Sequence, residues 1–461
     1  MNLYRLLQQR AADGRPLRVL LIGAGKFGSM FLAQARRTPG LHIVAVADLF
    51  IQRARENLAR VGWKMEQFGA KTLGQARRSG ATFVTEDASP VIASDHVEIV
   101  VEATGNPASG IRHVLACCQH GKHIIMVNVE ADALAGPVLA RRASEAGIIY
   151  SLAYGDQPAL ICEMADWARA AGFEVIAAGK GTKYLPAYHD STPDTVWSNY
   201  GFTSKQVAAG DFNAQMFNSF LDGTKSAIEM AAVANATGLT PAPQGLAFPP
   251  CSVDDLPRVL RPAAEGGQLH HRGQVEVVSS LERNGRPVAR DLRWGVYVTF
   301  AADSDYARRC FAEYGLVTDD SGNYAAMYKP YHLIGLELGI SVASVGARGE
   351  PTGTPDGFRG DAVAIAKRDL NPGELLDGEG GYTVWGRLMT AQDSLACAGL
   401  PIGLAHGIKV ARAVRKGALV SWRDVVAPDS EAARVRLDME ARFAAELGVQ
   451  SSTSQVQDST T

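Results

Sequence analysis

The chain has 461 residues, of which 46% are hydrophobic and 20% are charged, and its formal net charge is −2. This length exceeds what a single compact core usually holds, so we expect two or three domains of an ordinary globular protein. The balanced charge gives no indication of a nucleic-acid partner or of binding to an anionic membrane surface.

Cysteine usage and the N-terminal residues favour a cytoplasmic protein. None of the six cysteines forms a C-x-x-C pair, which argues against a zinc site and a disulfide scaffold. The N-terminal residues lack the apolar core of a signal peptide, and no apolar run is long enough for a transmembrane helix. We therefore expect a cytoplasmic protein without a nucleic-acid or membrane partner.

From Leu17 onward, apolar runs alternate with segments of helical periodicity. The runs are RVLLIGAG, HIVAVAD, ATFV, VEIVVEAT, HIIMVNV and IIYSLA. Strands that alternate with helices predict a parallel sheet with right-handed crossovers. We expect an α/β domain with a doubly wound parallel sheet of the Rossmann type at residues 1–154.

The following residues, 155–350, again alternate between helix and strand, so they predict an α/β catalytic domain that also forms the dimer contact. Within it, FLDGTKSAIEMAAVANATGL predicts one helix from Phe220 to Leu239. The helix is apolar and rich in alanine, yet its beginning carries charged side chains. Charges that are retained in such a segment indicate a functional role.

The last part of the chain predicts a small β-rich module at residues 351–447. It begins with a stretch rich in proline and glycine and contains two similar segments, AVAIAKRDLNPGELL and GIKVARAVRKGALVSWRDV. Its Lys367, Arg368 and Arg412 are candidate anion contacts, but the interpretation as solvated basic side chains is favoured. Residues 448–461 are polar and low in complexity, so we expect a disordered tail there.

The motif GAGKFG fits the dinucleotide pattern G-x-G-x-x-G, follows a predicted strand and opens a predicted helix. Gly23 would form the tight turn, Gly25 would admit the pyrophosphate, and Gly28 would let the helix pack closely on the strand. The N-terminus of the helix would supply the anion site. The expected cofactor residues of this loop are Gly23, Gly25, Lys26, Phe27 and Gly28.

The choice between NAD and NADP depends on the end of the second strand. Asp48 would accept hydrogen bonds from the ribose hydroxyls, which favours NAD. Arg53 could neutralise a 2′-phosphate, which favours NADP, whereas Arg55 is interpreted as part of a solvated helix face. The sequence leaves both cofactors open.

Three further residues are expected near the nicotinamide ribose. Thr104 and Gly105 follow the fourth strand, and Asn128 follows the fifth. The carboxyl ends of parallel strands form the edge at which ligands bind. The alternative interpretation is that these residues form ordinary turns.

In the second domain, the first turns of the helix predicted from Phe220 to Leu239 carry Asp222, Lys225 and Glu229. With Asp222 as the N-cap, Lys225 would lie in the first turn, where the helix dipole and burial lower a lysine pKa and the carboxylates raise it. Such a lysine can exchange a proton with a substrate oxygen. The alternative is a surface ion pair between residues four apart, which the uncharged neighbouring residues disfavour.

Further candidates come from two other segments. Lys180 and Lys183 end the strand FEVIAAGKGTKYLP, and Lys183, next to Tyr184, is favoured to hold a phosphate or carboxylate. Tyr331 and His332 directly precede an apolar run, where His332 could be an acid, a base or a structural residue. The catalytic candidates are therefore Lys183, Asp222, Lys225, Glu229, Tyr331 and His332.

The motifs GAGKFG and VEATGNP resemble the nucleotide domain of homoserine dehydrogenases. Those enzymes carry a helix with the pattern D-x-x-x-K, whereas KSAIEMAAVAN places Lys225 at the aspartate and Glu229 at the lysine. The charges are exchanged, which argues against homoserine as the substrate and implies that a catalytic lysine approaches from elsewhere on the helix.

Nearly all of residues 15–430 resemble the 1-deoxy-D-xylulose 5-phosphate reductoisomerase-like proteins, in which a homoserine dehydrogenase-like core precedes an SAF-type module. SLAYGDQPALICEM, AAGKGTKYLP, FLDGTKSAIEMAAVAN, YKPYHLIGLEL and AIAKRDLNPGE carry this resemblance. The nucleotide loop and the acidic metal triad of the classical reductoisomerase are not found.

The resemblance implies a chemistry of rearrangement followed by reduction, in isoprenoid biosynthesis. The substrate would be a small, polyhydroxylated ketone or aldehyde, with or without a phosphate group, and NADPH would reduce the rearranged aldehyde. Lys183 would contact the anionic group, Asp222, Lys225 and Glu229 would handle protons, and Tyr331 and His332 would close the pocket. A homodimer is implied by the architecture.

Two alternatives belong to other classes. One is a plain NAD(P)-dependent dehydrogenase of the homoserine type, acting on an alcohol or a sugar acid. The other is a dinucleotide-binding sensor without catalysis, which the ionisable groups of the second domain disfavour. A divalent metal is compatible with the chemistry, but no carboxylate cluster has the spacing of a metal site.

Overall fold

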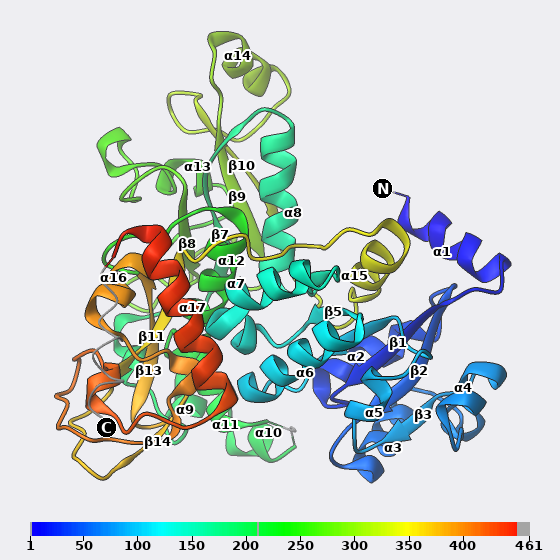
Figure 1. Cartoon of the computed structure of the whole chain (residues 1–461). Coiled ribbons are helices and arrows are strands. Elements are labelled where there is room, and N and C mark those ends of the chain that lie inside the picture. The colour runs from blue at the N-terminus through cyan, green and yellow to red at the C-terminus, as the bar shows by residue number, and fades with distance from the viewer. Residues whose placement is uncertain (1, 210–211, 450–461) are drawn as a thin grey trace. The chain divides into compact units, whose positions relative to one another are not determined.

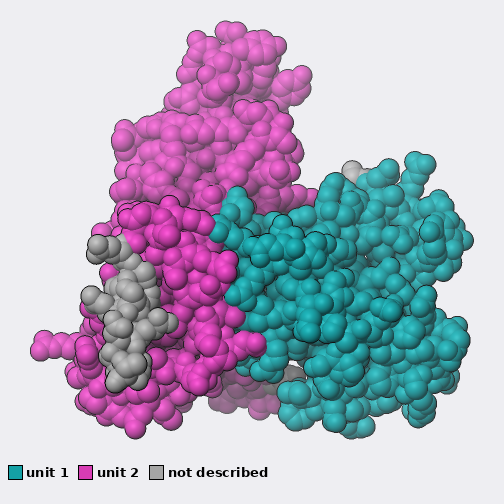
Figure 2. Space-filling model, in the orientation of Figure 1, with its two compact units in different colours: residues 1–160, 332–356 teal, residues 161–331, 357–461 magenta. Residues whose placement is uncertain are grey.

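A computed structural model describes residues 2–209 and 212–449 (Figure 1). From residue 450 on, the expected disordered tail lies outside the described residues. The chain forms two compact units, residues 1–160 with 332–356, and residues 161–331 with 357–461 (Figure 2). These units divide the chain differently from the expected boundaries, because residues 332–356 return to the first unit and the C-terminal module joins the second.

The first unit contains a six-stranded parallel sheet in the order β3-β2-β1-β4-β5-β6, which confirms the Rossmann prediction. The strands are β1 (Leu17–Ile22), β2 (Leu41–Ala47), β3 (Phe83–Thr85), β4 (Ile99–Glu102), β5 (His123–Met126) and β6 (Tyr150–Leu152). The helices are α1 (Leu3–Ala12), α2 (Lys26–Ala35), α3 (Ile51–Arg60), α4 (Leu73–Ser79), α5 (Ser89–Ile92), α6 (Pro107–His120), α7 (Val129–Glu145) and α15 (Gly339–Ala343).

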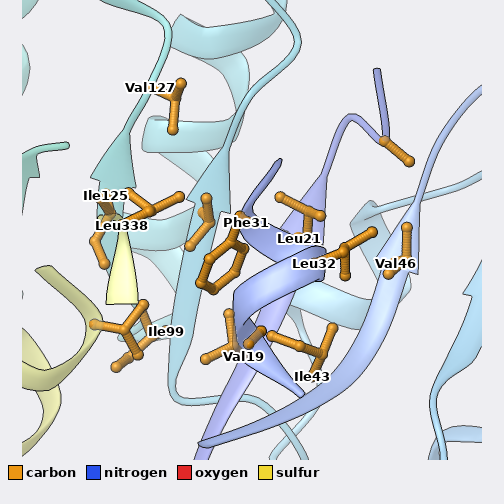
Figure 3. Close-up of a cluster of buried hydrophobic side chains, with 14 of the residues drawn as sticks. Val19, Leu21, Phe31, Leu32, Ile43, Val46, Ile99, Ile125, Val127 and Leu338 are labelled. Carbon is orange, nitrogen blue, oxygen red and sulfur yellow. The ribbon is translucent and has the colours of Figure 1, made fainter. Parts of the chain in front are cut away.

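The core of this unit lies between the sheet and its helices. Phe31 and Leu32 of α2 pack with side chains of β1, β2 and β4 (Figure 3). Leu338 and Val342, which come from the returning segment, are buried in the same cluster. Residues more than 300 positions apart in the chain thus share one core.

A buried carboxyl group in the first unit predicts a pH effect on stability. Asp132 of α7 is fully buried and accepts a hydrogen bond from the Tyr150 hydroxyl at 2.7 Å, and burial raises its pKa from 3.8 to about 7. The folded chain therefore holds this proton more tightly than the unfolded chain. The stabilising contribution is complete below pH 3.8 and is lost as the pH rises through about 7.

We expect Asp132→Asn, which keeps an oxygen for Tyr150, to gain stability relative to the wild type as the pH rises. The gain in unfolding free energy between about pH 5 and about pH 8.5 should be roughly 1–3 kcal/mol. Denaturant titrations at both pH values measure it, with the exposed Asp95→Asn as a control. An equal difference at both pH values would contradict the prediction.

The second unit contains a mixed four-stranded sheet in the order β10-β9-β7-β8 and two small antiparallel pairs, β11 with β13 and β12 with β14. Its strands are β7 (Glu174–Thr182), β8 (Gln274–Ser279), β9 (Val296–Ala301), β10 (Tyr324–Lys329), β11 (Gly360–Ala366), β12 (Leu375–Asp377), β13 (Val384–Thr390) and β14 (His406–Lys409). The fold class, a Rossmann sheet with an α/β catalytic part and small β pairs near the C-terminus, is confirmed.

The helices of the second unit include one that the sequence predicted to be longer. They are α9 (Val196–Tyr200), α10 (Ser204–Ala209), α11 (Ala214–Leu221), α12 (Thr224–Thr237), α13 (Leu256–Val259), α14 (Asp305–Glu313), α16 (Ala391–Cys397) and α17 (Glu431–Leu447), and α8 (Gln157–Ala170) begins in the first unit. No described helix is long and apolar enough to cross a membrane.

The single helix expected from Phe220 to Leu239 is wrong, because the chain breaks between α11 and α12. Gly223 has a φ of +93°, a left-handed conformation that other residues rarely adopt. Asp222 therefore ends α11 instead of capping α12, and Lys225 is the second residue of α12. The buried face of α12 packs against β11, β13 and β8, which explains its apolar composition.

Candidate active site

The loop between β1 and α2 has the geometry of a dinucleotide site. Gly23 has a φ of +93°, and a Cβ atom there would lie 2.6 Å from the carbonyl oxygen of Ala103. A Cβ atom on Gly28 would collide with the Gly23 carbonyl, so both glycines are required sterically. At Gly25, the N-cap of α2, a Cβ atom would meet nothing within 4 Å. The N-terminus of α2 is thus open to a pyrophosphate group.

The two other loop residues differ in their surroundings. Lys26, the first residue of α2, is exposed, so its ammonium group can reach a phosphate. Phe27 packs its side chain against the core of the unit. Its expected contact with the cofactor stays a prediction.

Asp48 is already held by the loop that it faces. Its Oδ2 accepts a hydrogen bond from Ala24 N at 2.8 Å, and its Oδ1 accepts one from Phe50 N at 2.9 Å. Its side chain is only 7% exposed. Arg53 of α3 lies 3.6 Å from Asp48 Oδ1 and 4.6 Å above the Phe50 ring, with 58% of its side chain exposed. This arrangement places a cation next to the group that would meet the ribose.

We expect Arg53→Ala to weaken NADPH binding by roughly tenfold or more, because a charge-assisted hydrogen bond contributes about 1.5–3 kcal/mol. NADH binding should change much less. Fluorescence titrations with each nucleotide measure the two affinities, and Arg55→Ala is the matched control. Equal losses for NADPH and NADH would contradict a contact between Arg53 and the 2′-phosphate.

The residues after β4 and β5 form one polar network. The Thr104 hydroxyl donates to Glu102 Oε1 at 2.6 Å, and His113 Nδ1 lies 3.2 Å from the same oxygen. Asn128 caps α7 through Ala131 N and donates to the carbonyl oxygen of Asn106 at 2.9 Å. The side chain of Asn128 therefore positions the ends of α6 and α7.

Gly105, between these residues, has a φ of +68°, and a Cβ atom there would meet nothing within 4 Å. This space at the carboxyl edge of the sheet leaves room for a ligand to approach the main chain. The role of Thr104, Gly105 and Asn128 at the nicotinamide ribose remains a prediction.

In the second unit, Lys180 of β7 and Glu229 of α12 form a buried ion pair. Lys180 is 5% exposed and Glu229 is 2% exposed. Lys225 lies one turn before Glu229 and is half-buried. The lysine that pairs with Glu229 thus comes from the strand, whereas the expected approach of a catalytic lysine from elsewhere on the helix stays a prediction.

Asp222 is also fully buried and pairs with a lysine that the sequence analysis left in solvent. Lys367 Nζ donates to Asp222 Oδ2 at 2.7 Å and to the carbonyl oxygens of Ser191 and Gly381 at 2.7 and 2.8 Å. Burial raises the pKa of Asp222, and the charge of Lys367 opposes this shift. The interpretation of Lys367 as a solvated basic residue is therefore wrong.

The remaining sequence candidates make other contacts. Lys183 is half-buried and donates to the carbonyl oxygen of Asn199 at 2.7 Å. Tyr331 is 50% exposed. It is the last residue of the second unit before the chain re-enters the first unit at His332. His332 belongs to the first unit, where its Nε2 lies 3.2 Å from Nε2 of Gln157.

The sequence analysis missed a site with aromatic side chains next to the first turn of α12. His189 Nε2 lies 2.9 Å from the Tyr184 hydroxyl, and His189 Nδ1 lies 2.7 Å from the carbonyl oxygen of Asp222. The imidazole stacks on Trp385 at 3.8 Å, and burial lowers its pKa. A cavity of about 100 Å³ is lined by His189, Gly223, Ala227, Gln244, Leu246, Phe248, Trp385, Gly386, Arg387 and Leu388. A histidine in the segment YHDSTPDT was the only local signal.

One buried carboxylate positions the wall of this cavity. Glu276 of β8 accepts hydrogen bonds from the main-chain N–H groups of Ala247, Phe248 and Val277, and burial raises its pKa to about 7. The Phe248 ring stacks on Tyr184 at 3.9 Å. In the described residues, no group of three or more histidine, cysteine or acidic side chains could hold a metal ion.

Two family models match the chain. Residues 17–126 match "Oxidoreductase family, NAD-binding Rossmann fold" (GFO_IDH_MocA), and residues 155–338 match "Oxidoreductase DRL, catalytic domain". No curated protein matches the sequence. The second match includes β7 and α12, and thus Lys180, Lys225 and Glu229.

Solved structures with a similar fold are oxidoreductases of low identity. An NAD-binding oxidoreductase from Klebsiella pneumoniae is 15% identical, with 68% of this chain and 66% of that chain covered and a TM-score of 0.32. A myo-inositol dehydrogenase from Corynebacterium glutamicum is 14% identical, with 39% and 48% covered and a TM-score of 0.27. A 3-ketoreductase from Actinomadura kijaniata is 17% identical, with 37% and 50% covered and a TM-score of 0.25. Similarities at this level carry no argument about the substrate.

Proposed function

We propose a substrate class and a reaction for this chain, which is an NAD(P)-dependent oxidoreductase with an NAD-binding Rossmann domain and a DRL-type catalytic domain. The substrate is a small, polyhydroxylated and phosphorylated carbonyl compound. The reaction is reductoisomerase-like: a carbon–carbon bond migrates to give an aldehyde, and the aldehyde is reduced to an alcohol.

The buried pair of Lys180 and Glu229 is the observation that supports this proposal. Two charges in a site closed to water interact strongly and can be aimed at oxygen atoms of a substrate. In this pair, the ammonium group of Lys180 would donate a hydrogen bond to the carbonyl oxygen of the substrate, and Glu229 would orient it. Lys225, one turn away, would exchange the proton of the neighbouring hydroxyl group.

The proposed reaction balances in two stages. Loss of the hydroxyl proton allows the carbon–carbon bond to migrate to the adjacent carbonyl carbon, whose oxygen takes up a proton, so the rearranged hydroxyaldehyde is an isomer of the substrate. A dinucleotide held by the loop of Gly23, Gly25 and Gly28 would supply the hydride that reduces this aldehyde. A proton from the lysine side chains completes the new alcohol, and one proton is taken up from solvent overall.

The test is to incubate the protein with NADPH and 1-deoxy-D-xylulose 5-phosphate and to follow absorbance at the nicotinamide band. Carbon NMR then determines the product skeleton. A branched product, 2-C-methyl-D-erythritol 4-phosphate, would support the proposal. An unbranched alcohol would replace it with a plain dehydrogenase, and nucleotide binding without turnover over a panel of sugar phosphates would favour a sensor.

A further inference from the structure

A cluster of cations and phenol groups lies in the second unit, beyond the end of β7. Lys183 Nζ lies 5.6 Å from the centre of the Tyr200 ring, and the Arg293 guanidinium lies 5.8 Å from the same ring. Arg293 also lies 4.6 Å from the ring of Trp294. Tyr188, on the turn Pro186–Asp190, is close enough for the charge of Arg293 to lower its pKa against the effect of burial.

The two cations lack a neutralising carboxylate. Within the described ranges, neither Lys183 nor Arg293 forms an ion pair with an acidic side chain. Burial and the charge of Arg293 both lower the pKa of Lys183, which indicates that the two groups repel each other. Two half-buried cations that converge without a counter-charge favour binding of an anion.

Hydrogen-bond donors remain available in this cluster. An ammonium group has three N–H donors, and Lys183 uses one of them for the carbonyl oxygen of Asn199. The guanidinium of Arg293 makes no hydrogen bond to a described residue. Burial raises the pKa of Tyr200 to about 12, so its hydroxyl stays protonated and can donate at neutral pH.

The cluster is near the beginning of α12. Tyr188 and Tyr200 pack in one cluster with Leu221, the last residue of α11, and α12 begins at Thr224. Lys183 itself follows Lys180 by three residues, and Lys180 pairs with Glu229. The cluster therefore directly follows the strand that carries Lys180, the proposed proton donor.

We propose that Lys183 and Arg293 bind the phosphate group of the substrate, with the hydroxyls of Tyr188 and Tyr200 as additional donors. This inference rests on the proposed function for the identity of the ligand. A phosphate monoester is favoured over a carboxylate because its charge, about −1.5 to −2 at neutral pH, matches two cations. Its three terminal oxygens can also accept from several donors at once.

The direct test uses inorganic phosphate as the probe. Phosphorus NMR or calorimetry measures its affinity for the full-length protein with NADP⁺ present at saturation, so that the nucleotide site is occupied. We expect Arg293→Gln and Lys183→Gln each to weaken phosphate binding by roughly tenfold. Arg293→Lys, which keeps the charge, should retain most of the affinity.

Arg309→Gln is the matched control. It removes an arginine of α14, outside the proposed site, that lies 5.9 Å from the ring of Tyr306 on the same helix. Thermal melting shows whether each variant is folded. Unchanged phosphate affinity in a folded Arg293→Gln protein would overturn the proposal, as would an equal loss in Arg309→Gln.

A second readout separates this inference from the proposed reaction. In the turnover assay, Arg293→Gln should raise KM for a phosphorylated substrate by roughly tenfold and leave KM for its unphosphorylated analogue unchanged. A specific phosphate site in a protein that does not rearrange the carbon skeleton would leave this inference standing and remove the proposed reaction. Equal KM changes for both substrates would overturn the phosphate assignment.

Discussion

Lys180→Met is expected to lower turnover by at least about 100-fold, while NAD(P)H still binds with unchanged affinity. The substitution removes the proposed proton donor, and general acid–base groups contribute about 10²–10⁴-fold to rates. It also leaves the carboxylate of Glu229 buried without its partner, which costs about 3–5 kcal/mol of stability. Steady-state kinetics, nucleotide titration and denaturant unfolding measure these three quantities.

A double variant separates catalysis from stability. Replacing both partners, Lys180→Met with Glu229→Met, removes the uncompensated charge, and buried pairs replaced by apolar groups often recover stability. We expect the double variant to be more stable than Lys180→Met and equally inactive. Recovery of turnover in the double variant would show that the pair only supports the fold.

Lys367→Met is expected to destabilise the second unit by about 3–5 kcal/mol, because breaking a buried pair leaves Asp222 uncompensated. Lys367 also donates hydrogen bonds to the carbonyl oxygens of Ser191 and Gly381, so its loss removes three hydrogen bonds in total. Denaturant unfolding measures the change.

The neighbouring residue supplies the control for this prediction. Arg368 is exposed and pairs with Glu374 at 2.7 Å, and an exposed pair contributes only about 0–1 kcal/mol. Arg368→Met should therefore unfold almost as the wild type does. Similar losses for Lys367→Met and Arg368→Met would contradict the role assigned to the buried pair.

The Rossmann sheet could be predicted from the sequence because its signals are local. Each strand is an apolar run, each turn is marked by glycine, and Asp48 follows the motif at the usual spacing. The break before α12 could not be predicted in the same way, since an aspartate followed by glycine occurs both within loops and at helix ends. Only the positive φ of Gly223 decides between these two cases.

The partners of the charged side chains could not be predicted because they are far apart in the chain. Asp222 and Lys367 are separated by 145 positions, and no periodicity relates one to the other. Lys180 and Glu229 lie on a strand and a helix whose register is set by packing. The sequence therefore indicated which charged residues lie within apolar segments. Which residue each of them pairs with depends on the tertiary structure.

The returning segment, residues 332–356, has a consequence for synthesis on the ribosome. Residues 1–160 emerge first, yet their core includes Leu338 and Val342, which are translated roughly 200 residues later. At translation rates of about 5–20 residues per second, this interval is on the order of 10–40 s. During that time the nascent Rossmann sheet exposes apolar surface, so its early protection falls to chaperones or to the ribosome itself.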